Sequence, residues 1–285
     1  MSKKTAVDLS TELAEGFVLP PAGIPTNVLQ RTVIPETGVG FHPRQSMKRA
    51  DDVLLPIITS AYLACGLHSG DPLVLHRLIP MLMENGIQIG AHPSFPGIFN
   101  FGQDHIEMNQ AELVSVFLYQ FGALDGVLRE FGQRIRSVKC HGALYFDVME
   151  KEWACAALIK AIRAFNPEII VVAPAISGTL EQVKASGLQV AAECYADRRY
   201  GSNGRIVRRS HPQAMVDSAE RAAAQILGVV RDGMIEAVDG TMIPMTADTF
   251  CLHSDTPGAA EMGKAIVAAL NAEGIEIKPT TATLI

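Results

Sequence analysis

The chain has 285 residues, 48% of them hydrophobic, and a formal net charge of −6 at pH 7. This hydrophobic content can build one large core or two small ones, whereas the acidic balance and the lack of a Lys/Arg block argue against a nucleic-acid partner. The first ten residues lack the apolar stretch of a signal peptide, and the apolar runs are far shorter than a membrane span. The five cysteines form no CxxC pair. We therefore expect a reduced, cytoplasmic protein without a membrane partner.

Short apolar runs alternate with helical patterns along the chain. The expected strands cover residues 6–9, 62–65, 87–91, 137–140, 169–173, 188–194 and 249–252. The helical patterns cover about residues 71–85, 109–131, 150–165, 214–233 and 257–274, with one more ending at residue 187. Residues 235–243 are typical of a small hairpin with an Asp-Gly turn. The Pro- and Gly-rich residues 17–49 break the alternation and are expected to form an irregular excursion.

Seven strand-then-helix units predict a single α/β domain over residues 1–285. Strands that are apolar on both faces indicate a parallel sheet covered by helices. Polar residues follow most of the strands, whereas in an open sheet they would gather at one switch point. We therefore predict a closed or nearly closed barrel, a (β/α)7 arrangement.

Titratable side chains follow the expected strands in one loop after another. Four of the eight histidines come directly after strands: His68, His92, His141 and His253. The other polar residues near strand ends are Asp8, Glu12, Glu15, Asp71, Lys139, Glu193, Asp197, Arg198 and Asp255. In a β/α barrel the strand ends meet at one mouth, so this convergence is the main sign of a functional site.

Structural roles also account for several of these residues. Asp71 and Asp255 stand just before prolines that could begin helices, so either could serve only as a helix cap. A single histidine after a strand is more often structural than catalytic, whereas four in equivalent places favour a site. The cysteines at strand ends are interpreted as packing residues.

The stretch ACGLHSGDP combines a turn with chemistry. Gly66 and Gly70 permit positive φ and close approach of a backbone or ligand. The helix that follows could hold an anion such as a carboxylate at its N-terminus, while His68 moves a proton. Because the chain has neither an HExxH motif nor a GxxxxGK[ST] motif, we assign no metal ligands and no phosphate loop of its own.

Five sequence blocks resemble those of the LamB/YcsF family of 5-oxoprolinase A subunits. In chain order they are ACGLHSGDP, IGAHPSFPG, VKCHGALYF, ECYADRRYGSNGRIVRRS and CLHSDTPGA. The resemblance covers about residues 51 to 274 and implies a distorted barrel of the glycoside hydrolase/deacetylase type. It also implies ATP-dependent opening of 5-oxoproline, a lactam, to glutamate, with ATP used through a complex containing proteins similar to the B and C subunits.

The matching positions in these blocks are His68, Asp71, His92, Lys139, His141, Asp197, Arg198, His253 and Asp255. With the first block added, the predicted catalytic residues are Glu12, His68, Asp71, His92, His141, His253 and Asp255. The predicted substrate-binding residues are Asp8, Gly70, Lys139 and Arg198. Histidine and carboxylate side chains suit acid–base work, and Lys139 or Arg198 suits the substrate carboxylate.

The first block departs from the family pattern. The family reads approximately DLNCDLGEGFG, whereas residues 8–18 here read DLSTELAEGFV, with Glu12 in place of Asp. Phe146, Leu67 and Ser254 are further departures, so the chain resembles a divergent paralogue. Two alternatives stay open: a metal-dependent deacetylase or amide hydrolase of the wider superfamily, and a non-catalytic component that binds a lactam. The metal requirement and self-association into a homo-oligomer are also left open.

Overall fold

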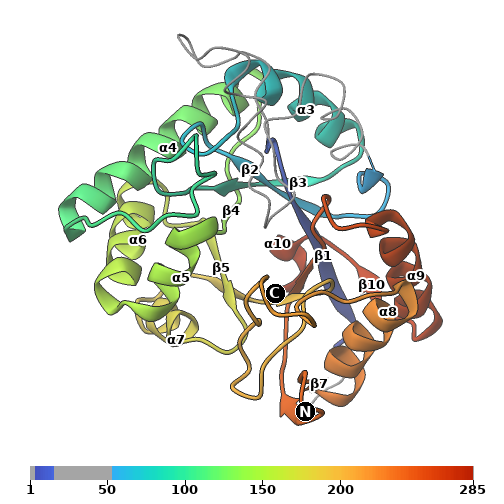
Figure 1. The fold of residues 1–285 in the computed structure, drawn as a ribbon. Coiled ribbons are helices and arrows are strands. Elements are labelled where there is room, and N and C mark those ends of the chain that lie inside the picture. Colours follow the sequence, from blue (N-terminus) through green and yellow to red (C-terminus); the bar gives the residue numbers. More distant parts are fainter. Residues whose placement is uncertain (1–3, 16–52, 285) are drawn as a thin grey trace.

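The computed structural model describes residues 4–15 and 53–284, so the excursion expected at residues 17–49 lies outside the described residues. Seven parallel strands form a barrel at the centre of the molecule (Figure 1). They are β1 (Ala6–Leu13), β2 (Ser60–Ala64), β3 (Gln88–His92), β4 (Ser137–Val138), β5 (Ile170–Pro174), β6 (Val190–Tyr195) and β9 (Thr249–Cys251). Because β1 pairs with β2 on one side and with β9 on the other, the barrel is closed, which confirms the predicted fold class.

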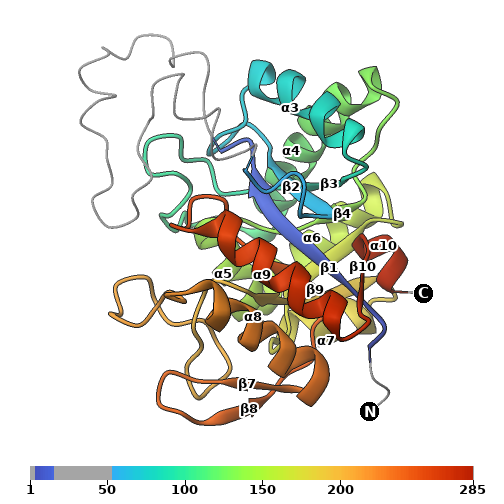
Figure 2. The ribbon, with the colours of Figure 1, turned by 90° about the vertical axis from the view of Figure 1, so that its right-hand side faces the viewer.

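Helices cover the outside of the barrel, as Figures 1 and 2 show. They are α3 (Pro72–Glu84), α4 (Gln110–Glu130), α5 (Gly142–Glu150), α6 (Glu152–Phe165), α7 (Gly178–Ala185), α8 (Ala219–Leu227) and α9 (Ala259–Ala272). The sequence predicted all but α5, although the helix expected over residues 214–233 begins only at Ala219. Asn109 and Glu112 form a reciprocal capping box at the start of α4, as their spacing suggested.

Five small elements complete the described part of the chain. The π-helix η1 (Gly228–Asp232) extends α8, and β7 (Met234–Glu236) pairs with β8 (Met242–Pro244) as the expected hairpin. The short strand β10 (Glu276–Ile277) and the helix α10 (Thr280–Thr283) were not expected. β10 pairs with the first residues of β1, so this C-terminal segment covers the end of the barrel opposite the carboxyl ends of the strands.

The barrel interior is more polar than the sequence analysis predicted. The expected first strand stopped at residue 9, whereas β1 continues to Leu13 and alternates Asp8, Ser10 and Glu12 with leucine and threonine. Side chains two residues apart share one face of a strand. Asp8 accepts hydrogen bonds from Thr249, among others, and Glu12 contacts His92 on β3 and Lys139 just after β4, so this face points inward. The hydrophobic core instead lies mainly between the strands and the helices.

By length and composition alone, α4 could cross a membrane, contrary to the expectation that every apolar run is too short. One such helix is weak evidence, because core helices pass the same test. Phe117, Phe121 and Leu124 on α4 are fully buried within the protein. We therefore interpret α4 as a core helix of the barrel.

Candidate active site

Lys139 lies at the centre of the barrel mouth between two glutamates. Its fully buried Nζ is 2.7 Å from Glu12 Oε1 and 2.7 Å from Glu193 Oε1, so residues on or next to β1, β4 and β6 each contribute to one ion-pair network. The ring of Tyr195 lies 4.6 Å from the same nitrogen. Burial by itself would lower the pKa of Lys139, but Cys251 and the two glutamates raise it well above the usual range, so the side chain is an ammonium ion.

The two glutamates beside Lys139 have pKa values shifted in opposite directions. Burial would raise the pKa of Glu12, but Lys139, His92 and His253 lower it well below the usual range. Burial raises the pKa of Glu193, and the attraction of Lys139 only partly offsets that rise. Two neighbouring carboxyl groups with opposite shifts are suited to different tasks, one as an ionised base and one as a proton-holding acid.

Three histidines gather on the other side of Glu12. His92 Nε2 lies 3.3 Å from Glu12 Oε2 and 3.0 Å from His141 Nδ1. The rings of His68 and His141 stack with their centroids 3.9 Å apart. Burial, followed by the proximity of His92, lowers the pKa of His141 to about 3, so His141 is neutral at physiological pH. Burial likewise lowers the pKa of His68.

Glu15 reaches this histidine group because the chain turns sharply after β1. Ala14 has a φ of 62°, in the left-handed region that a residue with a side chain adopts at a cost. Glu15 Oε1 then lies 3.5 Å from His141 Nδ1 and 3.9 Å from His68 Nε2. Strain of this kind often accompanies functional geometry.

His253 forms a second acid–base pair on the far side of the mouth. Its Nδ1 lies 2.9 Å from Asp197 Oδ2, and its Nε2 lies 3.8 Å from Glu12 Oε2. Thr256 also donates a hydrogen bond to the Asp197 carboxylate. Burial alone would lower the pKa of His253, but Asp197 and Glu12 raise it. The carboxylate of Asp197 thus orients the ring with one nitrogen toward Glu12.

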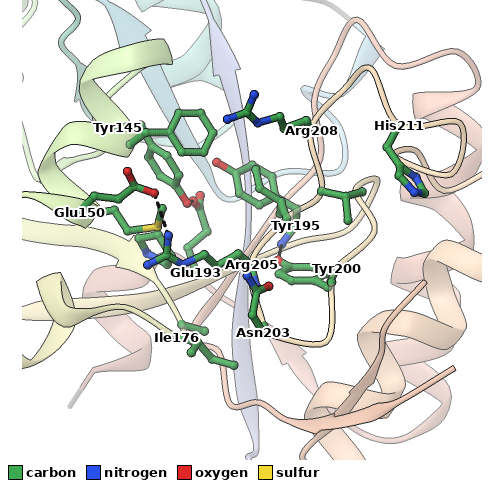
Figure 3. A pocket seen from close by; sticks show the side chains of 18 of the residues that line it. Tyr145, Glu150, Ile176, Glu193, Tyr195, Tyr200, Asn203, Arg205, Arg208 and His211 are labelled. Carbon is green, nitrogen blue, oxygen red and sulfur yellow. Dashed lines mark hydrogen bonds and ion pairs between the residues drawn. The ribbon is translucent and has the colours of Figure 1, made fainter. Parts of the chain in front are cut away.

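A cavity of about 980 Å³ opens beside the ion-pair network. Figure 3 shows its side chains, which include Tyr145, Glu150, Glu193, Tyr195, Arg205 and Arg208. Glu193 and Tyr195 belong both to this wall and to the surroundings of Lys139. A small acidic molecule in the cavity could therefore meet the acid–base cluster and arginine side chains together.

The structure brings six of the predicted site residues together: Glu12, His68, His92, Lys139, His141 and His253. Their catalytic and substrate-binding roles remain predictions.

Two predicted residues in the second block shape the loop that carries His68. The Asp71 carboxylate accepts hydrogen bonds from the backbone N–H groups of Leu73 and Val74, so it caps α3. Gly70 has a φ of +84°, and a Cβ there would lie 2.2 Å from the Ala64 carbonyl oxygen. Both residues therefore position the turn after β2, as the alternative interpretation of Asp71 proposed.

The remaining three predicted residues lie apart from the cluster. Asp255 is exposed and pairs with Arg209 at 3.7 Å. The Arg198 guanidinium donates a hydrogen bond to the Val207 carbonyl. Asp8 lies deeper in the barrel, where it accepts hydrogen bonds from four hydroxyl groups, those of Thr59, Ser60, Thr249 and Thr280.

Three acidic residues of the site were noted near strand ends but were given no role there. They are Glu15, Glu193 and Asp197. A signal for Glu193 was present, because it is the one charged residue in the otherwise apolar or aromatic strand β6, and a charge inside a buried strand must face a partner. No comparable signal marks Glu15, which depends on the unusual backbone of Ala14.

Several of these side chains could ligate a metal ion. Ligand atoms of Glu12, Glu15, His92 and His141 all lie within 4.8 Å of one another. A second, smaller group combines Glu12 with Cys251 and His253. The five cysteines of the chain are buried free thiols, as expected for packing residues, and burial raises the pKa of Cys65 to about 12.

A closed parallel barrel with histidines and carboxylates gathered at the carboxyl ends of its strands is the arrangement of a β/α-barrel enzyme. Comparison with known proteins identifies which barrel family this is. The model of the LamB/YcsF family matches residues 37–284, and the chain belongs to that family.

Curated relatives and a solved structure agree with this assignment. The chain is 42% identical over 229 residues to the 5-oxoprolinase A subunit of Acinetobacter baumannii, covering 80% of this chain and 90% of the relative. It is 38% identical to the 5-oxoprolinase A subunit of Pyrococcus furiosus, again covering 80% of this chain and 90% of the relative. The crystal structure of a lactam utilization protein from Thermus thermophilus superposes with a TM-score of 0.80 at 30% identity, covering 96% of this chain and 99% of that one.

Proposed function

We propose that this chain is the A subunit of a 5-oxoprolinase, which opens the lactam ring of 5-oxoproline to give glutamate. The observation that carries the proposal is the 42% identity, over 80% of the chain, with a protein of that name. The acid–base cluster beside a cavity of suitable size supports it, because ring opening requires a bound acidic lactam, an attacking water and a proton donor.

The chemistry divides between two steps. A lactam is a poor electrophile, so transfer of a phosphoryl group from ATP to the amide oxygen would activate the ring carbonyl carbon. Water then attacks this carbon, the C–N bond breaks, and the ring nitrogen receives a proton. A second water hydrolyses the glutamyl phosphate that this leaves, so 5-oxoproline, ATP and two waters give glutamate, ADP and inorganic phosphate.

The residues of this site suit the second step. Glu193 forms part of the cavity wall and has a raised pKa, so we assign it the proton that the ring nitrogen receives. Glu12 is held as a carboxylate 3.8 Å from His253 Nε2, so the pair is placed to orient the attacking water. Lys139 is fully buried and holds both carboxyl groups in place, with its Nζ 2.7 Å from each.

For the substrate carboxylate we propose Arg208 in place of the predicted residues. Arg208 lines the cavity and is exposed, whereas Arg198 holds a backbone carbonyl and Lys139 is enclosed by its two glutamates. A guanidinium group binds a carboxylate through two parallel hydrogen bonds, which suits a small acidic substrate.

We further propose that the chain works in the cytoplasm with partner proteins similar to the B and C subunits of 5-oxoprolinase. The relatives are named as an A subunit, which supports a multi-subunit enzyme. The sequence has no GxxxxGK[ST] motif, so ATP use is assigned to the assembled complex.

The test is to measure glutamate release from 5-oxoproline by the chain alone, with ATP, and with both ATP and the two partner proteins. We expect release only when ATP and the partners are present. No release, with partners that are active beside a standard A subunit, would overturn the proposed substrate. Hydrolysis of a lactam or an acetylated amide without ATP would support the metal-dependent alternative, and tight lactam binding without turnover would support the non-catalytic one.

A further inference from the structure

Two neighbouring histidines at the barrel mouth direct unprotonated nitrogens at each other. His92 Nδ1 lies 2.8 Å from the Lys139 carbonyl oxygen, and His141 Nε2 lies 2.9 Å from the Phe101 carbonyl oxygen. A carbonyl oxygen can only accept, so each of these nitrogens carries the ring proton. The remaining nitrogens, His92 Nε2 and His141 Nδ1, then carry lone pairs and are only 3.0 Å apart. Such a contact is repulsive unless a cation or a proton lies beside it.

His68 repeats the same arrangement. Its Nδ1 lies 2.8 Å from Ser94 Oγ, whose own proton is donated to the Phe95 carbonyl oxygen. The Ser94 hydroxyl is therefore the acceptor, and the lone pair of His68 lies on Nε2. This nitrogen is fully buried and has no hydrogen-bond partner among the residues that the structure describes. A buried polar atom of this kind requires an explanation.

Two carboxylates complete the group around these lone pairs. Glu12 Oε2 lies 3.3 Å from His92 Nε2, while the other oxygen of Glu12 binds Lys139. Glu15 Oε1 lies 3.5 Å from His141 Nδ1 and 3.9 Å from His68 Nε2. Metal–ligand bonds of about 2.0 to 2.2 Å place adjacent ligand atoms roughly 3.0 to 3.5 Å apart in octahedral or tetrahedral geometry. The separations between Glu12 and His92, between Glu15 and His141, and between His92 and His141 fall in that range. The separation between Glu15 and His68 is longer.

From this arrangement we propose that Glu12, Glu15, His92 and His141 bind one divalent transition-metal ion at the barrel mouth, with His68 Nε2 behind Glu15. Imidazole nitrogens combined with carboxylate oxygens select ions such as Zn²⁺, Co²⁺ or Mn²⁺ over Mg²⁺ or Ca²⁺, which prefer all-oxygen sites. The hydrogen bonds from His92 to the Lys139 carbonyl and from His141 to the Phe101 carbonyl are the outer contacts that fix metal-binding tautomers.

A proton between His92 and Glu12 is the competing explanation for the close contacts. It would relieve the contact between His92 and His141, but it would leave the carboxylate of Glu15 facing the lone pair of His141 Nδ1 at 3.5 Å with no positive charge between them. A cation among Glu12, Glu15, His92 and His141 relieves both contacts and is neutralised by the two carboxylates. Metal binding is a property of this chain alone, so its test is independent of the proposed ring-opening activity.

The experiment uses the full chain without a histidine tag, freed of metal with a chelator and dialysed. Co²⁺ is titrated while its visible absorption is recorded, Zn²⁺ is used as a competitor, and metal content is measured by elemental analysis. We expect one ion per chain, and an affinity loss of at least roughly a hundredfold in His92→Ala. His76→Ala is the matched control, because His76 is exposed and lies on the surface beside Glu130.

A second pair of variants keeps the test decisive if His92→Ala does not fold. Glu15 is partly exposed at the rim, so Glu15→Gln should fold and bind Co²⁺ about tenfold or more weakly. His141→Ala removes a ligand from a neighbouring loop and should weaken binding at least about a hundredfold. The proposal is overturned if the wild-type chain binds no stoichiometric Co²⁺ or Zn²⁺. It is also overturned if Glu15→Gln and His141→Ala both bind with wild-type affinity.

Discussion

Replacing Lys139 with methionine should destabilise the barrel strongly, and the loss should depend on pH. The substitution roughly keeps the length of the side chain but removes the ammonium that pairs with Glu12 and Glu193, each at 2.7 Å. At an effective dielectric constant near 20, the pair with the Glu12 carboxylate contributes about 6 kcal/mol of attraction, most of which offsets the cost of burying the two charges. Removing one partner of a buried ion pair typically costs about 3 to 5 kcal/mol, and we expect that loss at pH 8.

The loss should shrink as the pH falls from 8 to 5. Without the ammonium, the pKa values of the buried carboxyl groups Glu12 and Glu193 rise in the folded protein, which then holds a proton that the unfolded chain lacks above about pH 4.5. A group with a raised folded pKa adds stability at low pH and loses it as the pH rises. Each proton held only by the folded state therefore restores up to about 1.4 kcal/mol per pH unit on acidification.

Urea unfolding of the metal-free wild type and of Lys139→Met at pH 5, 6.5 and 8 measures this difference. Comparing the two proteins at each pH removes the contribution of histidines that titrate in both. Lys184→Met serves as the control, because Lys184 is exposed and lies 3.9 Å from Glu181. A loss below about 1 kcal/mol at pH 8, or a loss of the same size at pH 5, would refute the assigned role of the ammonium.

Three further predictions concern packing, capping and binding. Gly90→Ala should lower the unfolding free energy by about 1 to 3 kcal/mol, because its Cβ would lie 2.6 Å from the buried ring of Tyr62. Gly126→Ala, on the open face of α4, should instead raise the unfolding free energy by about 0.5 to 1 kcal/mol. Equal unfolding midpoints for the two variants would contradict this packing. Asp71→Ala should lower the unfolding free energy by about 1 kcal/mol, whereas Asp71→Asn, which keeps a capping oxygen, should match wild type in stability and turnover. A roughly hundredfold fall in kcat for Asp71→Asn would instead show that Asp71 is a catalytic residue. Arg208→Ala should raise the KM for 5-oxoproline by about 10- to 100-fold with kcat little changed, and an unchanged KM in steady-state assays would exclude its assigned role.

The sequence predicted the barrel well because its signals are local and repeated. Buried parallel strands give apolar runs, and helices after them carry distinct starts, such as the capping box at Asn109. The expected convergence of histidines also follows from topology, because all strand ends of a parallel barrel meet at one mouth. Four histidines from four loops do meet Glu12 or its neighbours there.

The polar interior was harder to predict. Asp8, Ser10 and Glu12 alternate with leucine and threonine, a period-two pattern that a longer first strand would have explained. Partners across the barrel do not follow from spacing, so the pairing of Lys139 with Glu193 became visible only in three dimensions. Spacing along the chain also does not predict how deeply a side chain is buried in the barrel mouth. Asp255 follows the last strand nearly as closely as His253 does, but Asp255 is exposed whereas His253 is buried.

The central claim is that the carboxyl group of Glu193 takes part in opening a lactam ring. The most direct test measures kcat for glutamate release from 5-oxoproline, with ATP and the partner proteins present, in Glu193→Gln and in the surface control Glu181→Gln. Loss of a general acid should reduce kcat by about 10²- to 10⁴-fold in Glu193→Gln and leave Glu181→Gln unchanged. A Glu193→Gln protein that folds normally and keeps kcat within about twofold of wild type would contradict this claim.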